Sequence, residues 1–226
     1  MNLILDLNFE GKDVVIVGGG AEGYRKVLSF LDAFAKVLVV SRKFLDDIHT
    51  LHQLKQIDLL TLNIEDPKAF VNSLTPKPDL IVAVTNNQNL NGKLAKSAKA
   101  LGCMVYAVDN PAISDFMVPA IAKIGDVRIA VSTSGKSPSM ARVLRKRIEK
   151  MITEDDLLQI KLQDYLRPIL KKQFSEQKLR KVVLAELIED LQIQKLLKKG
   201  KFDDAKQFAL DIVASFQDKN HDIEEV

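Results

Sequence analysis

The chain has 226 residues, 46% hydrophobic and 28% charged, with a formal net charge of +3. This length allows a substantial core or two domains, and so small a charge gives no case for nucleic-acid binding. Its single cysteine excludes an internal disulfide, and the absence of a signal-peptide pattern or a long apolar run predicts a cytoplasmic protein without membrane spans.

The N-terminal part contains a glycine-rich turn between a predicted strand at 14–17 and a predicted helix. The sequence Gly18-Gly19-Gly20-Ala21-Glu22-Gly23 fits G-x-G-x-x-G. In this fingerprint Gly18 permits the tight turn, Gly20 lets a pyrophosphate approach the backbone, and Gly23 lets the helix pack against the strand. The N–H groups at the helix start then face the phosphates. The motif favours nucleotide binding over a glycine turn that binds nothing.

Strands and helices alternate as far as residue 112. Apolar runs predict further strands at 36–40, 59–62, 79–84 and 104–108. Helical patterns fill the intervals, and the first of them places on one face Val27, Leu28, Leu31 and Phe34. The alternation predicts an α/β fold with an N-terminal Rossmann parallel sheet over residues 1–112.

The second predicted strand ends without the acidic residue that usually binds the ribose of NAD. Ser41, Arg42 and Lys43 follow it instead. The Ser41 hydroxyl can bond a ribose hydroxyl, whereas the two cations could receive a 2′-phosphate, which would favour NADP. The alternative is that both cations are only solvated. We expect a nicotinamide dinucleotide, and the sequence leaves NAD and NADP open.

A carboxylate follows the fifth predicted strand. Ligands of open α/β sheets bind at the carboxyl ends of strands, so Asp109 could face the nicotinamide and accept a proton as hydride leaves the substrate. The alternative is that Asp109 only starts a turn, since Asp-Asn-Pro is a good turn sequence. Asp115 is a weaker competitor for the same role.

The pattern changes after Pro111. Two β-like runs at 116–124 and 127–132 flank Gly125-Asp126, a two-residue hairpin signal. A loop rich in hydroxyls and backbone donors follows, with Ser137 as the expected N-cap of a helix, and it includes Thr133, Ser134, Gly135 and Ser137. Such a loop is an anion site for carboxylates or phosphates, and plain helix capping is a compatible alternative.

The remainder is predicted to be helical and charged. The expected helices span 138–152, 155–173, 176–198 and 202–216. Arg142 belongs to a basic group on the first of them, which is either a solvated face or part of a cleft for a polyanionic substrate. His49 and His52 have the spacing of a metal pair but no third ligand nearby, so we predict no metal site.

Several of these segments together resemble a known family. They are Gly18–Gly20 with Arg25-Lys26, then Ala83-Val84-Thr85-Asn86, Val108-Asp109-Asn110-Pro111, Phe116-Met117-Val118-Pro119-Ala120, and Ser137-Pro138 with Ala141-Arg142. Over residues 3 to about 150 the chain resembles precorrin-2 dehydrogenase, the dehydrogenase–chelatase module of siroheme synthase.

The resemblance implies a Rossmann domain at 1–112, a small β dimerisation segment at 113–147 and a C-terminal helical domain at 148–226, in a homodimer. The implied reaction is NAD-dependent oxidation of precorrin-2 to sirohydrochlorin in siroheme biosynthesis. Some members also insert ferrous iron, which is then a substrate.

The resemblance also implies roles for individual residues. Cofactor contacts fall at Ala21, Glu22, Arg42 and Lys43, and the family motif after the fourth strand adds Thr85 and Asn86 to the cofactor-binding candidates. The family's essential aspartate matches Asp109. The many carboxylates of precorrin-2 suit the hydroxyl-rich loop and Arg142. Thr133 replaces a serine that is modifiable in some members.

The alternative function is a regulatory Rossmann module that senses NAD(H) without catalysis. Such modules usually carry an acidic residue at the end of the second strand, which this chain lacks. They also have no need of a hairpin and a hydroxyl-rich loop after the fifth strand. The sequence therefore favours the dehydrogenase.

Overall fold

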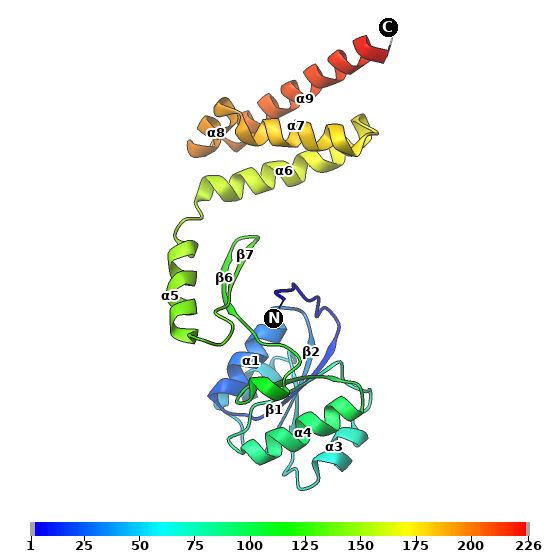
Figure 1. The fold of residues 1–226 in the computed structure, drawn as a ribbon, viewed down its shortest axis with the longest axis vertical. Coiled ribbons are helices and arrows are strands. Elements are labelled where there is room, and N and C mark those ends of the chain that lie inside the picture. The colour runs from blue at the N-terminus through cyan, green and yellow to red at the C-terminus, as the bar shows by residue number, and fades with distance from the viewer. Residues whose placement is uncertain (1–2, 225–226) are drawn as a thin grey trace. The chain divides into compact units, whose positions relative to one another are not determined.

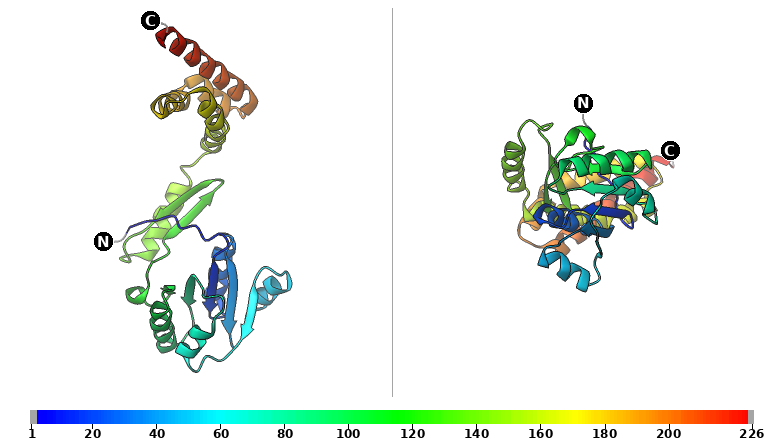
Figure 2. Two further views of the ribbon diagram at one scale, coloured as in Figure 1. Left: turned by 90° about the vertical axis from the view of Figure 1, so that its right-hand side faces the viewer. Right: turned by 90° about the horizontal axis from the view of Figure 1, so that it is seen from below.

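The computed structural model describes residues 3–224, which form two compact units that meet in the sequence between Val118 and Pro119 (Figures 1 and 2). The first unit ends a few residues after the boundary expected at 112. The division of the rest at 147 stays a prediction, as does the role of 113–147 in dimerisation.

The first unit is built on a five-stranded sheet in the order β3-β2-β1-β4-β5. Its strands are β1 Asp13–Val17, β2 Lys36–Ser41, β3 Asp58–Thr61, β4 Leu80–Ala83 and β5 Met104–Ala107. Every neighbouring pair is parallel, and Ile16 at the centre pairs with Val39 on one side and Val82 on the other. The α/β prediction is confirmed, because each predicted strand falls within a residue or two of an observed one.

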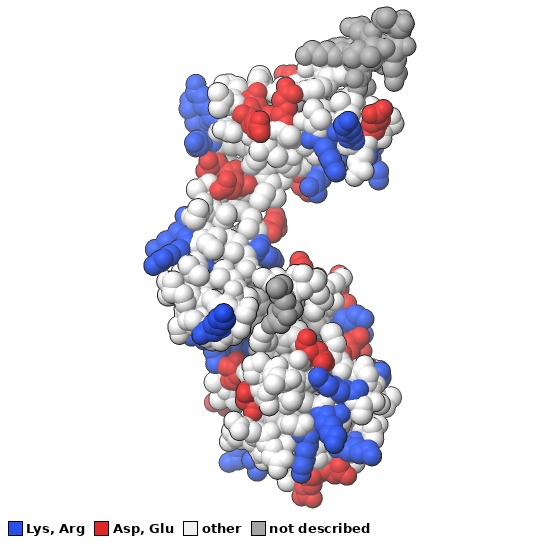
Figure 3. All heavy atoms as spheres, in the orientation of Figure 1, with Lys and Arg blue, Asp and Glu red and all other residues white. Residues whose placement is uncertain are grey.

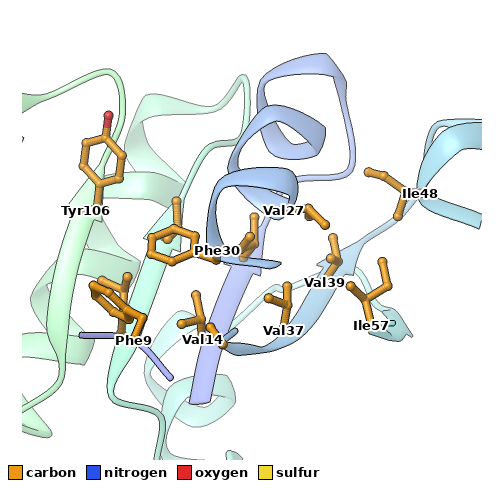
Figure 4. Close-up of a cluster of buried hydrophobic side chains, with 13 residues drawn as sticks. Phe9, Val14, Val27, Phe30, Val37, Val39, Ile48, Ile57 and Tyr106 are labelled. Atoms are coloured by element: carbon orange, nitrogen blue, oxygen red, sulfur yellow. The ribbon is translucent and has the colours of Figure 1, made fainter. Parts of the chain in front are cut away.

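Both faces of this sheet are buried, because successive side chains point to opposite sides. Val14 and Ile16 pack with Val27 and Phe30 in one cluster (Figure 4). Val15 and Val17 belong to the other cluster. The helices that contribute to the first cluster are α1 Ala21–Leu31 and α2 Asp46–Gln53, and those of the second are α3 Pro67–Ser73 and α4 Gln88–Ala100.

The first helix buries only part of the expected face. Val27 is buried and Leu31 packs against the same cluster, as predicted, but the other buried residues are Gly23 and Phe30, while Leu28 is exposed. The chain leaves α1 after Leu31, and Phe34 takes a positive φ of 57° with its side chain 76% exposed. The helix therefore ends before Phe34, although the apolar periodicity of the sequence continues to that residue.

The second unit contains an antiparallel hairpin packed against a helix. Strands β6 Ala120–Ile124 and β7 Val127–Val131 pair through a two-residue turn at Gly125-Asp126, as predicted, although β6 begins later than the expected residue 116. Helix α5, Pro138–Glu149, contacts both strands. Its N-cap is Ser137, whose hydroxyl accepts the Met140 N–H at 3.2 Å.

Four more helices complete the second unit. They are α6 Glu154–Gln173, α7 Gln177–Glu189, α8 Leu191–Lys198 and α9 Phe202–Glu224. The prediction of one helix over 176–198 is wrong, because Asp190 leaves helical geometry at ψ 118° and its carboxylate caps α8 by accepting the N–H groups of Gln192 and Ile193. Residues 225–226 of the predicted helical domain lie outside the described residues.

Candidate functional site

A cavity of about 730 Å³ opens at the carboxyl ends of the parallel strands. It lies where β1 and β4 are neighbours, the point at which the strand order reverses and where open α/β sheets bind ligands. Nine of the predicted site residues line it: Gly18, Gly20, Ala21, Glu22, Ser41, Arg42, Thr85, Asn86 and Asp109. The fold thus brings the predicted cofactor residues and the predicted proton acceptor to one cavity.

The glycine turn has the shape that a dinucleotide requires. Gly18 has a φ of +133°, and a Cβ there would lie 2.6 Å from the carbonyl oxygen of Val84. A Cβ on Gly23 would overlap the carbonyl oxygen of Gly18, so helix and strand are in close contact. At Gly20, by contrast, no described atom would lie within 4 Å of a Cβ. The backbone at Gly20 is therefore open to a ligand, while Gly18 and Gly23 are fixed by packing.

Gly19 also has a structural role that the fingerprint did not predict. A Cβ at this position would overlap the carbonyl oxygen of Lys43, and the N–H of Leu45 donates to the Gly19 carbonyl at 3.0 Å. The loop after β2 therefore rests directly on the glycine turn. The run of three consecutive glycines was the available signal, since the motif itself leaves this position free.

The start of α1 is available to an anion. Within the described residues, no side chain caps this helix, so its first N–H groups keep their capacity to bind phosphate oxygens. Glu22 lies in the first turn and forms ion pairs with Arg25 and with Lys26, the latter at 3.4 Å. Lys26 also lies over the Tyr106 ring, 5.0 Å from its centroid. These cations offset the charge that Glu22 adds beside the phosphate position.

Two loops form the end of the cavity where the ribose is expected. Ser41 at the end of β2 and Arg42 after it line the cavity, whereas Lys43 is exposed and is not among the lining residues. Asn63 and Glu65, on the loop after β3, line the cavity too, and this loop starts beside Ser41, whose carbonyl accepts the Leu62 N–H at 3.0 Å. Sequence reasoning missed this loop, because its place beside Ser41 follows from the pairing of β2 with β3.

Asp109 follows β5 at the edge of the cavity. Its neighbours are fixed, since the Val108 N–H donates to Ala83 at 3.1 Å and the Asn110 N–H donates to Ala107 at 3.1 Å. Asp109 itself is exposed. Asp115 is instead engaged, because it accepts the Val105 N–H at 2.8 Å and pairs with Lys99 at 2.8 Å. The geometry therefore leaves Asp109 as the free carboxylate of the two.

The expected anion loop gathers at one end of α5 in the second unit. The Thr133 hydroxyl accepts the Ser137 N–H at 3.0 Å, and Ser137 caps the helix. Ser134 and Gly135 both have positive φ, 52° and 79°. Arg142 is exposed one turn into the helix. The capping role of this loop is thus observed.

Other site classes have little support in residues 3–224. Among them, no group of three His, Cys, Asp or Glu side chains could hold a metal ion. No described helix is long and apolar enough to cross a membrane. On the faces shown in Figure 3, basic and acidic side chains occur together on each unit.

Two family models match the chain. One, described as "Putative NAD(P)-binding", covers residues 5–120, and the other, described as "Sirohaem biosynthesis protein central", covers residues 125–151. The chain is 34% identical to a precorrin-2 dehydrogenase of Methanosarcina barkeri over 192 residues. This aligned segment spans 83% of this chain and 82% of that protein. The chain belongs to the precorrin-2 dehydrogenase family. The resemblance drawn from the sequence is confirmed, and a nicotinamide cofactor with it.

Further relatives of this family agree. A protein of Methanocaldococcus jannaschii named "Putative precorrin-2 dehydrogenase" is 30% identical over 85% of this chain and 93% of its own length. Siroheme synthase of Nitrosomonas europaea is 34% identical over 146 residues, which are only 30% of that longer protein. The solved structure of SirC, a precorrin-2 dehydrogenase, has the same fold, with a TM-score of 0.73 and 21% identity over 93% of this chain and all of that one.

Proposed function

We propose that this protein oxidises precorrin-2 to sirohydrochlorin with a nicotinamide dinucleotide as hydride acceptor, in siroheme biosynthesis. The relatives of similar length carry the name of this reaction. The observation that carries the proposal is the meeting of the open glycine turn and the free carboxylate of Asp109 in one cavity.

The chain's own residues account for cofactor binding. The open backbone at Gly20 and the first N–H groups of α1, at Ala21 and Glu22, receive the pyrophosphate. Ser41 and Arg42 hold the adenosine ribose, and Thr85 with Asn86 border the central part of the cavity. Once bound, the dinucleotide supplies the two-electron acceptor that the protein itself lacks.

Asp109 is the proposed proton acceptor. Oxidation of the macrocycle removes a hydride and a proton, and the hydride goes to the nicotinamide. A carboxylate at the cavity edge can take the proton if the substrate lies within hydrogen-bond reach. The same group could remove pyrrole N–H protons if ferrous iron is inserted as a second substrate.

The anion loop of the second unit is proposed to bind substrate carboxylates. Ser134 and Gly135 take positive φ in this loop, Thr133 and Ser137 shape it by capping, and its hydroxyl groups are the proposed donors to the substrate. Arg142 adds a positive charge on the same helix. A substrate with many carboxylates matches such a site, because charge-assisted hydrogen bonds are the stronger class.

We propose NAD as the physiological cofactor. Glu65 lines the cavity on the loop that starts beside Ser41, and its negative charge on this side would repel a 2′-phosphate. Arg42 acts in the opposite sense, so the preference is expected to be modest.

We also propose that the segment at 113–147 holds two copies together in the cytoplasm. Helix α5 buries only Ala141, while Met140, Val143 and Ile148 on its apolar stripe stay exposed. Ile121 on β6 is also exposed. An amphipathic helix usually buries its apolar stripe, so a second copy is the proposed cover.

The first experiment is optical. Precorrin-2 generated without oxygen is mixed with the protein and NAD or NADP in separate cuvettes, and the visible spectrum is recorded. The proposal requires the sirohydrochlorin spectrum with stoichiometric reduced cofactor, and ferrous iron added afterwards tests metal insertion. A folded protein that binds NAD but leaves precorrin-2 unchanged would refute the enzyme and favour the sensor.

A further inference from the structure

One polar side chain in the core lies beside the cofactor cavity and has no role in the proposal above. Among residues 3–216, Asn91 is the buried polar residue, with 1% of its surface exposed. It belongs to the first turns of α4 and lines the cavity. Burying an amide costs free energy unless its groups are hydrogen-bonded, so its partners show what it holds.

All hydrogen-bond partners of the Asn91 side chain are in Thr85. The Thr85 N–H donates to Asn91 Oδ1 at 3.2 Å, and the Thr85 hydroxyl donates to the same oxygen at 2.6 Å. Asn91 Nδ2 donates to the Thr85 carbonyl at 3.0 Å. One side-chain amide thus satisfies both backbone groups and the hydroxyl of a single residue.

Thr85 needs this support because it lies just beyond the sheet. Val84 is the last residue of this segment whose N–H bonds to the neighbouring strand, and it donates to the Val17 carbonyl at 2.9 Å. From Thr85 on, the chain runs along the cavity through Asn86 and Asn87. Buried backbone groups that lose their strand partners must find others, and Asn91 provides them.

We propose that Asn91 is a positioning residue for the cofactor: it fixes the Thr85–Asn87 loop at the point where the dinucleotide crosses from the β1 side to the β4 side of the cavity. The inference rests on the proposed function. Gly18 packs against Val84, so the two loops that border the crossing are linked. Only an amide fits the arrangement, because it accepts and donates in the same plane.

The test compares the NAD affinity of four proteins by isothermal titration calorimetry, well below the lowest unfolding midpoint. Asn91→Leu removes every bond to Thr85 and is expected to weaken NAD binding about tenfold or more. Asn91→Asp keeps the acceptor but sets a carboxylate oxygen against the Thr85 carbonyl in place of the donor, so a loss of affinity is expected here too. Leu94→Ala is the matched control, since Leu94 is buried in the same helix but does not line the cavity.

The inference holds if both Asn91 variants lose affinity for NAD while Leu94→Ala, with a comparable fall in its unfolding midpoint, binds NAD like the wild type. Wild-type affinity in Asn91→Leu would overturn it, and so would an equal loss in Leu94→Ala, which would reduce Asn91 to a core residue. If Asn91→Leu does not fold, Asn91→Asp against the control decides. Failure of the wild type to bind NAD or NADP would instead refute the proposed function.

Discussion

At the residue scale, four glycines of one turn have different physical tasks. Gly18, Gly19 and Gly23 each face a carbonyl oxygen that a side chain would displace, so packing demands glycine there. Gly20 faces open space, so only a ligand could demand it. Substitution of Gly18, Gly19 or Gly23 should therefore lower the stability of the fold, whereas substitution of Gly20 should lower the affinity for the cofactor.

Alanine at Gly20 and at Gly18 should give opposite results. Gly20→Ala is expected to fold with a free energy of unfolding within about 1 kcal/mol of the wild type, but to bind NAD at least about tenfold more weakly, because its methyl group occupies the pyrophosphate position. Gly18→Ala is expected to lose about 2 kcal/mol or more of stability from its positive φ and the contact with Val84. Urea unfolding and calorimetric NAD titration measure both. Equal stabilities would contradict the assignment.

Asp109→Asn should separate catalysis from binding. The amide has the same shape but cannot accept a proton, so turnover of precorrin-2 is expected to fall about 100-fold or more while NAD affinity changes little. The anaerobic spectroscopic assay measures turnover. The matched control is Asp115→Asn, which should lose stability rather than turnover, because Asp115 bonds to Val105 and Lys99. Normal turnover in Asp109→Asn would remove the residue from the mechanism.

At the element scale, the strands are joined at their starts as well as at the cavity. Asp79, just before β4, accepts the Asp13 N–H at the start of β1 at 3.0 Å and pairs with Lys12 at 3.1 Å. The backbone hydrogen bond from Asp13 and the Lys12 ammonium lower the pKa of Asp79 below its usual value. The two central strands are thus tied at the end opposite to the site.

This link predicts a dependence of stability on pH. Because the folded-state pKa of Asp79 lies below the unfolded-state value, the contribution is complete above the unfolded pKa of about 4 and is lost as the pH falls through the lower folded pKa. Asp79→Asn should therefore destabilise the protein at pH 7, by about 1 kcal/mol or less for so exposed a pair, and the difference from the wild type should shrink below pH 4. Urea titrations at several pH values measure it. A difference that grows on acidification would contradict the sign.

At the scale of the whole molecule, each unit has its own core. The parallel sheet of the first unit holds the cavity. The helices α6 to α9 of the second unit enclose a separate cluster that includes Leu162, Leu166 and Leu187. Between these clusters along the chain, α5 and the hairpin bury few of their apolar side chains. Their exposed stripe is the surface to which we assign the proposed dimer contact.

A charge on this stripe should weaken the proposed dimer. The wild type is expected to sediment at twice its mass of 25.3 kDa. Val143→Asp should shift the equilibrium toward the monomer by about tenfold or more in dissociation constant, because it places a carboxylate in an apolar interface. Val182→Asp is the control, since Val182 is similarly exposed but lies on α7. Analytical ultracentrifugation distinguishes the forms, and a monomeric wild type would refute the dimer.

The sequence by itself determined what depends on neighbours along the chain. The five strands, the hairpin turn at Gly125-Asp126 and the N-cap at Ser137 follow from local periodicity and turn chemistry, and the structure confirms them. The glycine turn and Asp109 could be found in the same way, because strand ends of a parallel sheet meet at one edge.

Only the tertiary structure decided what depends on residues far apart or on competition between local preferences. The contact of the loop after β3 with Ser41, through the Leu62 N–H, and the contact of Gly19 with Lys43 follow from strand pairing and loop packing. The break at Asp190 reflects a cap that outcompetes a continuous helix. The buried amide of Asn91 reads as an ordinary polar residue of a helix until folding places Thr85 against it, since a hydrogen bond is fixed by distance in space and not by position in the chain.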